Sequence, residues 1–400
     1  MVFAKEVYSS FVDSGVVRVG ELPSHWSFKP LFYTGVSIKT GREDVNIQTE
    51  DGEYPFFTCG RAPKRASQFS FDCEALLIAG NGEVGYTNYY KGKFEAYQRV
   101  YVVTALKAWE PGFLRYFVAN YLIGDLQDKS IGSVIQFITL GDLRHFKVPM
   151  PPLEEQKSIA RFLDHETAKI DELIAKPERL IELLKEKVVS LTLTPYQPGA
   201  AVEVRMSSVV DLVNRPVLQN PEEEYVPLGL YNRGRGLFHK EPRRMSEMGD
   251  SDFYWVKEGD LIISGQFAWE GAVALAGSSE DGCVVSHRYP VLRGSQGKAC
   301  TEYIYSLLLT KHGDFLLNEN SRGAAGRNRP LNIQSLLKQN IPLPPMGIQE
   351  SVAKAVHAWR KASDKGQVKI RLLRERRTAL ISAAVTGKIN VRNWKPAESQ

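Results

Sequence analysis

The sequence has few of the features that mark secreted or membrane-spanning proteins. Its four cysteines, Cys59, Cys73, Cys283 and Cys300, form no Cys-x-x-Cys pair. Scattered thiols in a chain of 400 residues favour a reducing compartment over a disulfide scaffold. No segment approaches the roughly 20 apolar residues of a membrane span, and the charged start Met-Val-Phe-Ala-Lys-Glu is unlike a signal peptide. We therefore expect a cytoplasmic protein that makes no membrane contact.

Familiar catalytic motifs are also absent. The sequence contains no Gly-x-x-x-x-Gly-Lys-Ser/Thr loop, no Asn/Asp-Pro-Pro-aromatic tetrapeptide and no Pro-Asp dipeptide. These absences argue against a phosphate loop, a standard adenine-methylating site and a common nuclease motif. The seven histidines show no metal-ligand spacing. Gly80–Gly85 has the glycine spacing of a dinucleotide turn, but it lies between expected strands and not before a helix. We expect no catalytic residue, no bound cofactor and no metal in this chain.

The composition allows more than one folded core. Hydrophobic residues make up 43% of the chain, which suits globular structure over most of its length. The net charge of +5 and a pI near 8.8 permit a polyanionic partner without requiring one.

A proline-rich motif occurs twice. Val148–Gln156 reads Val-Pro-Met-Pro-Pro-Leu-Glu-Glu-Gln, and Ile341–Gln349 reads Ile-Pro-Leu-Pro-Pro-Met-Gly-Ile-Gln. Upstream, Leu76–Gly80 is echoed by Leu261–Gly265, and Gln98-Arg99 is echoed by His287-Arg288. Residues 20–150 show strand-like alternation with glycine turns, followed by a helical pattern from Pro111 to Ile123. The repeat therefore predicts two mixed α/β halves of one plan.

Each copy of the motif leads into a long helical pattern, over residues 153–193 and from about residue 348 to 385. Pro177 predicts a kink in the first helix. The interval from Gln156 to Leu183 exceeds that from Gln349 to Leu372 by four residues, which predicts a second helix shorter by about one turn. The bland interpretation is two ordinary surface helices. Their length and equivalent positions favour a coiled-coil-like pair.

The charges of the two helices are complementary. Residues 153–187 carry seven bases and nine acids, whereas residues 354–377 carry nine bases and two acids. Such charges select partner and orientation in paired helices. The basic helix could alternatively face DNA.

One basic segment has the side chains needed to bind nucleic acid. In Ser321–Asn332, Arg322, Arg327 and Arg329 can fork onto phosphate or guanine, and Asn328 can pair with adenine. The equivalent segment of the first half is less basic, but Ser133 and Gln136 there can still read bases. The alternative is a solvated basic loop. Further candidates, basic or amide side chains near aromatics, are Arg61, Lys64, Arg65, Asn81, Asn88, Arg99, Arg233, Arg235, Lys240, Arg243 and Arg288.

Four ordered segments resemble the specificity subunit of type I restriction-modification systems. Asp13–Val16 with Gly20–Trp26 looks like that family's opening, and Val148–Gln156 followed by Ile159–Leu163 looks like its central junction. Ile341–Gln349 repeats the junction, and Ala383–Arg392 looks like its C-terminal ending. Pro177 and the segment Leu193-Thr-Pro-Tyr-Gln-Pro depart from the usual central helix, and the second recognition domain lacks a clear Leu-Pro-x-x-Trp opening.

The resemblance implies an α+β protein: two mixed α/β target recognition domains in tandem, separated by two long antiparallel coiled-coil-like helices. The implied divisions are a first recognition domain over residues 1–152, a first long helix over 153–195, a second recognition domain over 196–345, a second long helix over 346–390 and a tail over 391–400. Each recognition domain would read one half of a bipartite target in double-stranded DNA.

The resemblance also implies partners. Two methyltransferase subunits would bind this non-catalytic DNA-recognition subunit, and two restriction subunits, the motor-nucleases, can join them. S-adenosylmethionine, ATP and Mg would belong to those partners. Two rival hypotheses stay open at this point: a stand-alone DNA-modifying enzyme with an unrecognised active site, and a coiled-coil scaffold that binds only proteins.

Overall fold

The chain forms two compact units. One consists of Met1–Ala175 together with Lys369–Gln400, and the other of Lys176–Val368. The computed structural model describes residues 8–129, 137–193, 201–218, 220–249, 251–323 and 329–396. Both units contain strands and helices, and the two longest helices, α3 (Leu153–Leu193) and α7 (Met346–Val385), contribute to both. The α+β class is thus confirmed, whereas the domain boundaries stay a prediction because the units divide the long helices.

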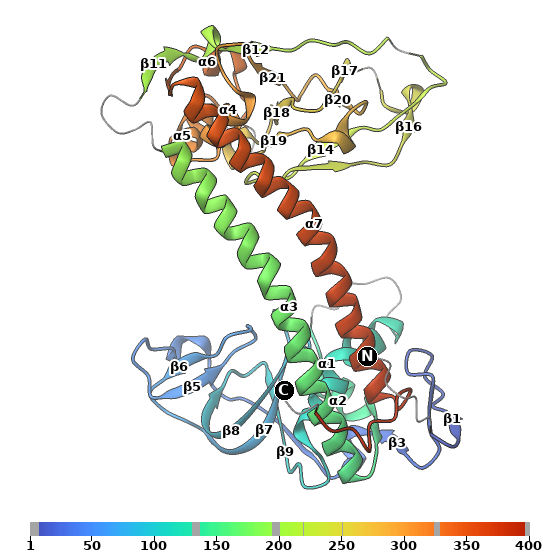
Figure 1. The fold of residues 1–400 in the computed structure, drawn as a ribbon. Helices are drawn as coiled ribbons and strands as arrows, with labels where there is room; N and C mark the ends of the chain where they lie inside the picture. Colours follow the sequence, from blue (N-terminus) through green and yellow to red (C-terminus); the bar gives the residue numbers. More distant parts are fainter. Residues whose placement is uncertain are drawn as a thin grey trace. The chain divides into compact units, whose positions relative to one another are not determined.

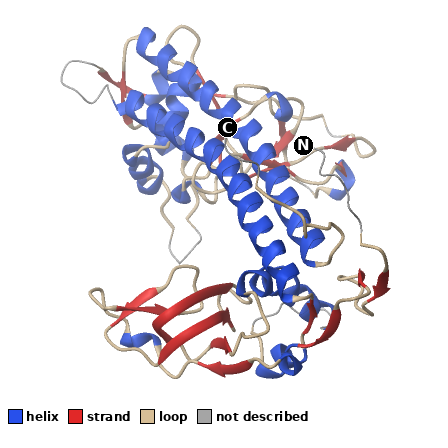
Figure 2. Cartoon of the chain, turned by 60° about the horizontal axis from the view of Figure 1, so that its bottom comes forward, coloured by secondary structure: helices blue, strands red, loops and turns tan. Residues whose placement is uncertain are grey.

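The first unit is built on a six-stranded sheet with the order β4-β9-β7-β8-β5-β6. Figure 2 shows strands in red. The central strands β7, β8 and β9 are antiparallel, and β5 runs parallel to β8. Two smaller antiparallel pairs, β1-β2 and β10-β3, complete its strands. The strands are β1 (Phe11–Asp13), β2 (Glu21–Pro23), β3 (Ser27–Pro30), β4 (Ser37–Thr40), β5 (Tyr54–Phe57), β6 (Lys64–Ala66), β7 (Phe71–Ala79), β8 (Thr87–Ala96), β9 (Val100–Thr104) and β10 (Lys147–Met150).

Helix α1 (Pro111–Lys129) covers one face of this sheet. Its Phe113, Phe117 and Leu122 are fully buried in a core that also contains Leu76 and Ile78 of β7. The short helix α2 (Leu140–His145) begins with a capping box between Thr139 and Asp142, which satisfies backbone N–H groups at its first turn. The loop between these helices is therefore anchored at its far end.

The second unit has shorter strands around a four-stranded sheet of order β12-β21-β18-β19. Its remaining strands form two-stranded pairs. The strands are β11 (Val202–Arg205), β12 (Val210–Leu212), β13 (Glu224–Tyr225), β14 (Leu228–Leu230), β15 (Leu237–His239), β16 (Arg243–Arg244), β17 (Phe253–Trp255), β18 (Leu261–Ile263), β19 (Val273–Leu275), β20 (Val284–Ser286), β21 (Val291–Gly294) and β22 (Asn340–Leu343). Its helices, besides the long pair, are α4 (Thr301–Leu308), α5 (Lys311–Glu319) and α6 (Ile333–Leu337).

The repeated proline-rich motif forms the same structure twice. Its first residues make β10 in the first unit and β22 in the second, each antiparallel to a strand from the start of its half. The glutamine that ends each motif is almost fully buried. Gln156 accepts a bond from the N–H of Glu110 (2.9 Å) and donates to the carbonyl of Pro151 (2.9 Å). Gln349 accepts from the N–H of Cys300 (2.9 Å) and donates to Pro344 (2.8 Å).

Within each unit α3 and α7 lie side by side (Figure 1). In the first unit, Ile170 and Ile174 of α3 form a buried cluster with Ile370 of α7, and Arg377 pairs with Asp171 at 2.8 Å. In the second unit, a Cβ added to Gly366 of α7 would meet the Cδ1 of Ile181 at 2.8 Å. The early part of one helix thus packs on the late part of the other, which makes the pair antiparallel.

Helix α3 has 41 residues and α7 has 40, so the prediction of a second helix shorter by one turn is wrong. Similar leucine-rich sequences, at Leu183 and Leu372, lie at different distances from the helix starts and are not equivalent. Helix α3 runs through Pro177 without ending.

The segment after α7 belongs to the core of the first unit. Val391 is buried among residues of the first half, together with Ile381, Ala384 and Val385 of α7. The Trp394 ring meets the Phe162 ring edge-on, with centroids 5.4 Å apart. The Arg392 guanidinium lies 4.9 Å from the ring of Tyr8, the residue at which the described chain begins. Both chain ends are therefore parts of one unit.

Candidate nucleic-acid interface

Three segments of the first unit meet where the central strand β7 ends. Gly80 follows this strand and donates its N–H to the carbonyl of Arg99 at 2.8 Å. The N–H of Ile138, which follows the loop after α1, donates to the Gly80 carbonyl at 2.7 Å. A Cβ at Gly80 would lie 2.5 Å from the Arg99 oxygen, so this approach requires glycine.

The second unit repeats this junction at the end of β18. Gly265 donates to the carbonyl of Arg288 at 2.7 Å and accepts from the N–H of Leu331 at 2.8 Å. A Cβ there would lie 2.6 Å from the Arg288 oxygen. The two sequence echoes, at the glycines and at the arginines, are therefore structurally equivalent. In each unit the junction gathers the turn after the central strand, an arginine segment and a loop that leads into a short helix.

An arginine-bearing loop docks on each turn. In the first unit, the N–H of Glu83 in the turn donates to the carbonyl of Cys59 at 3.0 Å. In the second, Arg233 and Gly234 donate to the carbonyls of Glu270 and Gly271 at 2.9 and 2.8 Å. Arg233 has φ of +60°, a conformation that non-glycine residues rarely adopt and that is maintained by these bonds. Both loops carry predicted DNA-binding arginines.

The basic loop of the second unit is described only at its two ends. Arg322 donates to the Glu319 carboxylate at 2.8 Å, and the Arg329 guanidinium stacks over the Trp269 ring at 5.3 Å. Arg327 and Asn328 lie outside the described residues, as do Ser133 and Gln136 of the equivalent loop. Because Leu331 and Ile138 are anchored equivalently, the two loops end at matching places.

The other predicted residues divide into two groups. Arg61, Asn81, Arg99, Arg233, Arg235 and Arg288 belong to the two junctions. Lys64 and Arg65 lie on β6, at the edge of the large sheet. Asn88 lies on β8 opposite Leu77. Arg243 lies on β16 opposite Tyr225, and Lys240 follows β15. No hydrogen bond among the described residues links this second group to the junctions.

Sequence reasoning did not select three side chains of the junctions, Glu83, Asn232 and Glu270. Glu83 accepts from Arg61, and Glu270 accepts from the Asn232 amide. The Gly80–Gly85 segment, which matched the glycine spacing of a dinucleotide turn, is the turn between β7 and β8. The glutamate in its middle was the available signal, since a carboxylate among basic residues tends to bind one of them.

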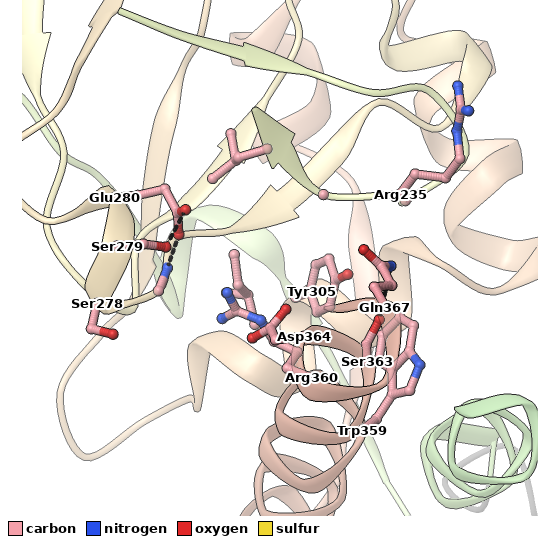
Figure 3. Close-up of a pocket in the computed structure, with 15 residues that line it drawn as sticks. Arg235, Ser278, Ser279, Glu280, Tyr305, Trp359, Arg360, Ser363, Asp364 and Gln367 are labelled. Carbon is pink, nitrogen blue, oxygen red and sulfur yellow. Dashed lines mark hydrogen bonds between the residues drawn. The ribbon is translucent and has the colours of Figure 1, made fainter. Parts of the chain in front are cut away.

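Two adjoining cavities of about 220 and 470 Å³ lie in the second unit, between the Tyr231–Leu237 segment and the long helices. In one, the Glu280 carboxylate accepts from the Gly277 N–H at 2.7 Å and from the Ser279 hydroxyl (Figure 3). The Trp359 ring stacks on that of Tyr305, whose pKa burial raises to about 12. The Arg235 side chain points away from these rings (Figure 3).

Two kinds of feature are absent from the described part of the chain. It contains no group of three or more histidine, cysteine, aspartate or glutamate residues placed to hold a metal ion. None of its helices contains an apolar stretch long enough to cross a membrane.

Two similarly built units joined by two long helices define a class of internally repeated, two-unit proteins, and comparison with known proteins identifies the family. The family model described as "Type I restriction modification DNA specificity domain" matches residues 35–183 and 239–372, one match in each half. Because these matches cover more than half of the chain, the protein belongs to the family of type I restriction-modification DNA specificity proteins.

Individual relatives agree with this assignment. The chain is 35% identical over 169 residues to the specificity subunit of the type I restriction enzyme EcoDI of Escherichia coli, an alignment that spans 42% of this chain and 37% of that protein. The chain thus covers well under two thirds of that relative's length.

Two solved structures share the fold. The S subunit of a type I restriction-modification system from M. genitalium has a TM-score of 0.57 at 15% identity, covering 90% of this chain and 96% of that one. A chain from a structure on complex assembly and conformational transition of the type I R-M system has a TM-score of 0.52 at 16% identity, covering 92% and 99%. At such identities the likeness concerns the fold alone.

Proposed function

We propose that this chain is the DNA-recognition subunit of a type I restriction-modification complex. Each of its two units binds one half of a bipartite sequence in double-stranded DNA. The chain itself carries no catalytic residue. It directs a partner methyltransferase, and a restriction subunit where one is present, to the sequence that it reads.

One observation carries this proposal. Two family-matched segments have the same bonded junction at Gly80 and Gly265, yet different exposed side chains surround the two glycines. A shared frame with different contact residues is what reading two different half-sites requires, because side chains at base edges determine sequence preference. The arginines at both junctions supply donors suited to phosphate and guanine.

The proposal extends to partners and cofactors. Two methyltransferase subunits bind the chain, and two restriction subunits join them where the system has such subunits, with the helix pair formed by α3 and α7 as the scaffold. S-adenosylmethionine, ATP and Mg bind to those subunits and not to this chain. In support, the fold resembles that of a chain from a structure on complex assembly of the type I R-M system.

Mapping N6-methyladenine across the genome tests the proposal. A host with this gene and its partner genes should methylate a split sequence, and deletion of this gene should abolish that methylation. Replacing residues 20–147 by those of a relative should change one half-site only. A change in both half-sites, or in neither, would exclude modular reading. Methylation or cleavage by the purified chain alone would show that it is an enzyme.

A further inference from the structure

The two junctions hold one arginine each in a similar way, although their loops share no sequence motif. In the first unit, Arg61 donates its Nε–H to the Glu83 carboxylate at 3.3 Å. Its guanidinium lies 5.7 Å from the centroid of the Tyr86 ring. The side chain is nevertheless 75% exposed, so these contacts orient the guanidinium without covering it.

Arg235 has a matching set of contacts in the second unit. Its Nε–H donates to the carbonyl of Asn232 at 3.0 Å, and its guanidinium lies 5.3 Å from the Tyr231 ring centroid. The Asn232 amide donates in turn to the Glu270 carboxylate. Glu270 therefore acts on Arg235 indirectly, through Asn232, whereas Glu83 bonds Arg61 directly.

Both arginines therefore donate a hydrogen bond to the protein through Nε. Their two terminal nitrogens stay available for a ligand. Neither pair of terminal nitrogens has a hydrogen-bond partner among the described residues. In the close-up of the neighbouring cavity, Arg235 extends away from Tyr305, Trp359 and Arg360 (Figure 3). A guanidinium fixed by its Nε and by a tyrosine ring presents two parallel N–H donors, the geometry that suits guanine O6 and N7 or a phosphate.

We propose that Arg61 and Arg235 are the equivalent DNA contacts of the two units and that Glu83 and Glu270 are their positioning residues. The inference rests on the proposed function, because it assumes that the junctions face DNA. Glu83 and Arg61 form an exposed ion pair, and such pairs add little to stability, so Glu83 acts on the direction of the arginine and not on the fold. The direct bond to Arg61 makes Glu83 the stronger of the two.

The test compares Glu83→Gln and Glu270→Gln in the full chain assembled with its methyltransferase subunits. Binding is measured to the mapped target and to duplexes altered in one half-site at a time. Glu83→Gln should lower the preference for the correct first half-site about fivefold, near the lower end of what a bidentate arginine contributes. The second half-site should be unaffected. Glu270→Gln should act only on the second half-site, and by less.

If only the net charge mattered, Glu83→Gln would have the opposite effect on DNA binding. Removing a negative charge beside DNA should strengthen binding to every sequence alike, so a general gain in affinity would overturn the proposal. In a chain that already carries Arg61→Ala, Glu83→Gln should have no further effect on specificity; a full effect in that background would also overturn it.

Matched controls come from helix α3. Glu154 and Glu182 are exposed acids paired with Lys157 and Arg179 at 2.8 Å. Their change to glutamine should leave half-site preference unchanged, and an equal loss in the controls would count against the proposal. If the unaltered complex fails to prefer the mapped target, the proposed function fails. If it prefers the target but Glu83→Gln does not relax that preference, the positioning role fails.

Discussion

The two units share a set of hydrogen-bonded positions but differ in the length and number of their strands. In the first unit the central strands β7 and β8 have 9 and 10 residues within a six-stranded sheet, whereas β18 and β19 of the second unit have three each within a sheet of four strands. Yet the hydrogen bonds at Gly80 and Gly265, and at Gln156 and Gln349, connect equivalent positions. The two units therefore differ in the size of their sheets, whereas the hydrogen bonds at the ends of their central strands are the same.

The contrast is sharpest one residue before the echoed strand sequence. Ala75 occupies this position in the first unit and is fully buried in an apolar cluster. In the second unit the position holds Asp260, which is also fully buried and is bound by Arg215 and Arg293. One frame accommodates either a methyl group or a charged cluster, provided that each buried oxygen has a partner.

A second contrast lies beside the repeated glutamine. Glu155, before Gln156, is buried and accepts bonds from the Trp26 indole at 2.9 Å, from His25 at 2.8 Å and from the Tyr8 hydroxyl at 3.2 Å. The equivalent residue of the second copy is Ile348. The first proline-rich motif thus has an additional polar residue, Glu155, that binds the N-terminal segment. The second motif has an apolar residue at the equivalent position.

The largest expected loss of stability follows from a change at Asp260, and it should be confined to the second unit. Changing Asp260 to Ala leaves two arginines without their buried partner and should lower the free energy of unfolding of the second unit by about 3 kcal/mol, the low end for a broken buried ion pair because both arginines reach solvent. Hydrogen exchange followed by mass spectrometry should show faster exchange in β18 and β21 with the first unit unchanged. The exposed Asp211→Ala on β12 is the control, and equal losses in both variants would contradict this interpretation.

Acid should reveal the same difference. Burial raises the pKa of the Asp260 carboxyl, but bonds from Arg215, the Lys257 N–H and Arg293 outweigh burial and hold that pKa below its usual range. The stabilisation is therefore complete above about pH 4, near the pKa of an unfolded aspartate, and is lost as pH falls through the lower folded value. Exchange in the second unit should accelerate over that range, and Asp260→Asn should remove this dependence. An unchanged profile in the variant would mean that other groups cause it.

The repeated glutamines should give a matched pair. Gln156→Ala and Gln349→Ala each remove a buried side chain that bonds both an N–H and a carbonyl, so each should cost about 1–3 kcal/mol in its own unit. The measurement is exchange in β10 and β22. Similar losses would confirm that the two copies are equivalent in energy as well as in geometry, and a several-fold difference would refute that equivalence.

The smallest effect is expected around Glu155. Trp26→Phe removes one hydrogen bond to Glu155 and leaves those of His25 and Tyr8, so the first unit should lose about 1 kcal/mol. Thermal unfolding of the full chain, with exchange to assign the unit, measures it. Trp394→Phe, at a tryptophan near the C-terminus, controls for ring size. A loss confined to the second unit would exclude this account.

The sequence allowed prediction of those features that depend on repetition and periodicity. The two halves, the two long helices and the repeated junction follow from Val148–Gln156, Ile341–Gln349 and the apolar spacing after them. The prediction of relative helix lengths is wrong because Leu183 and Leu372, although similar in their local sequence, occupy non-equivalent positions in the two helices. The glutamate within Gly80–Gly85 was a signal for an ion pair with some basic residue, but neither its pairing with Arg61 nor the burial of Val391 in the first core could be predicted, because contacts between distant residues produce no local pattern. Whether the predicted side chains bind DNA stays a prediction.

The discontinuity of the first unit affects the order in which the protein can fold on the ribosome. A nascent chain emerges from its N-terminus, and domains generally fold as soon as they are complete. Every residue of the second unit precedes Lys369, whereas the first core needs Ile381, Ala384, Val385 and Val391. Of these two units, the one whose synthesis starts earlier is thus completed later. Until Val391 has emerged from the ribosome, the apolar surface that α7 will cover stays open, and such surface makes a partly folded chain prone to aggregation.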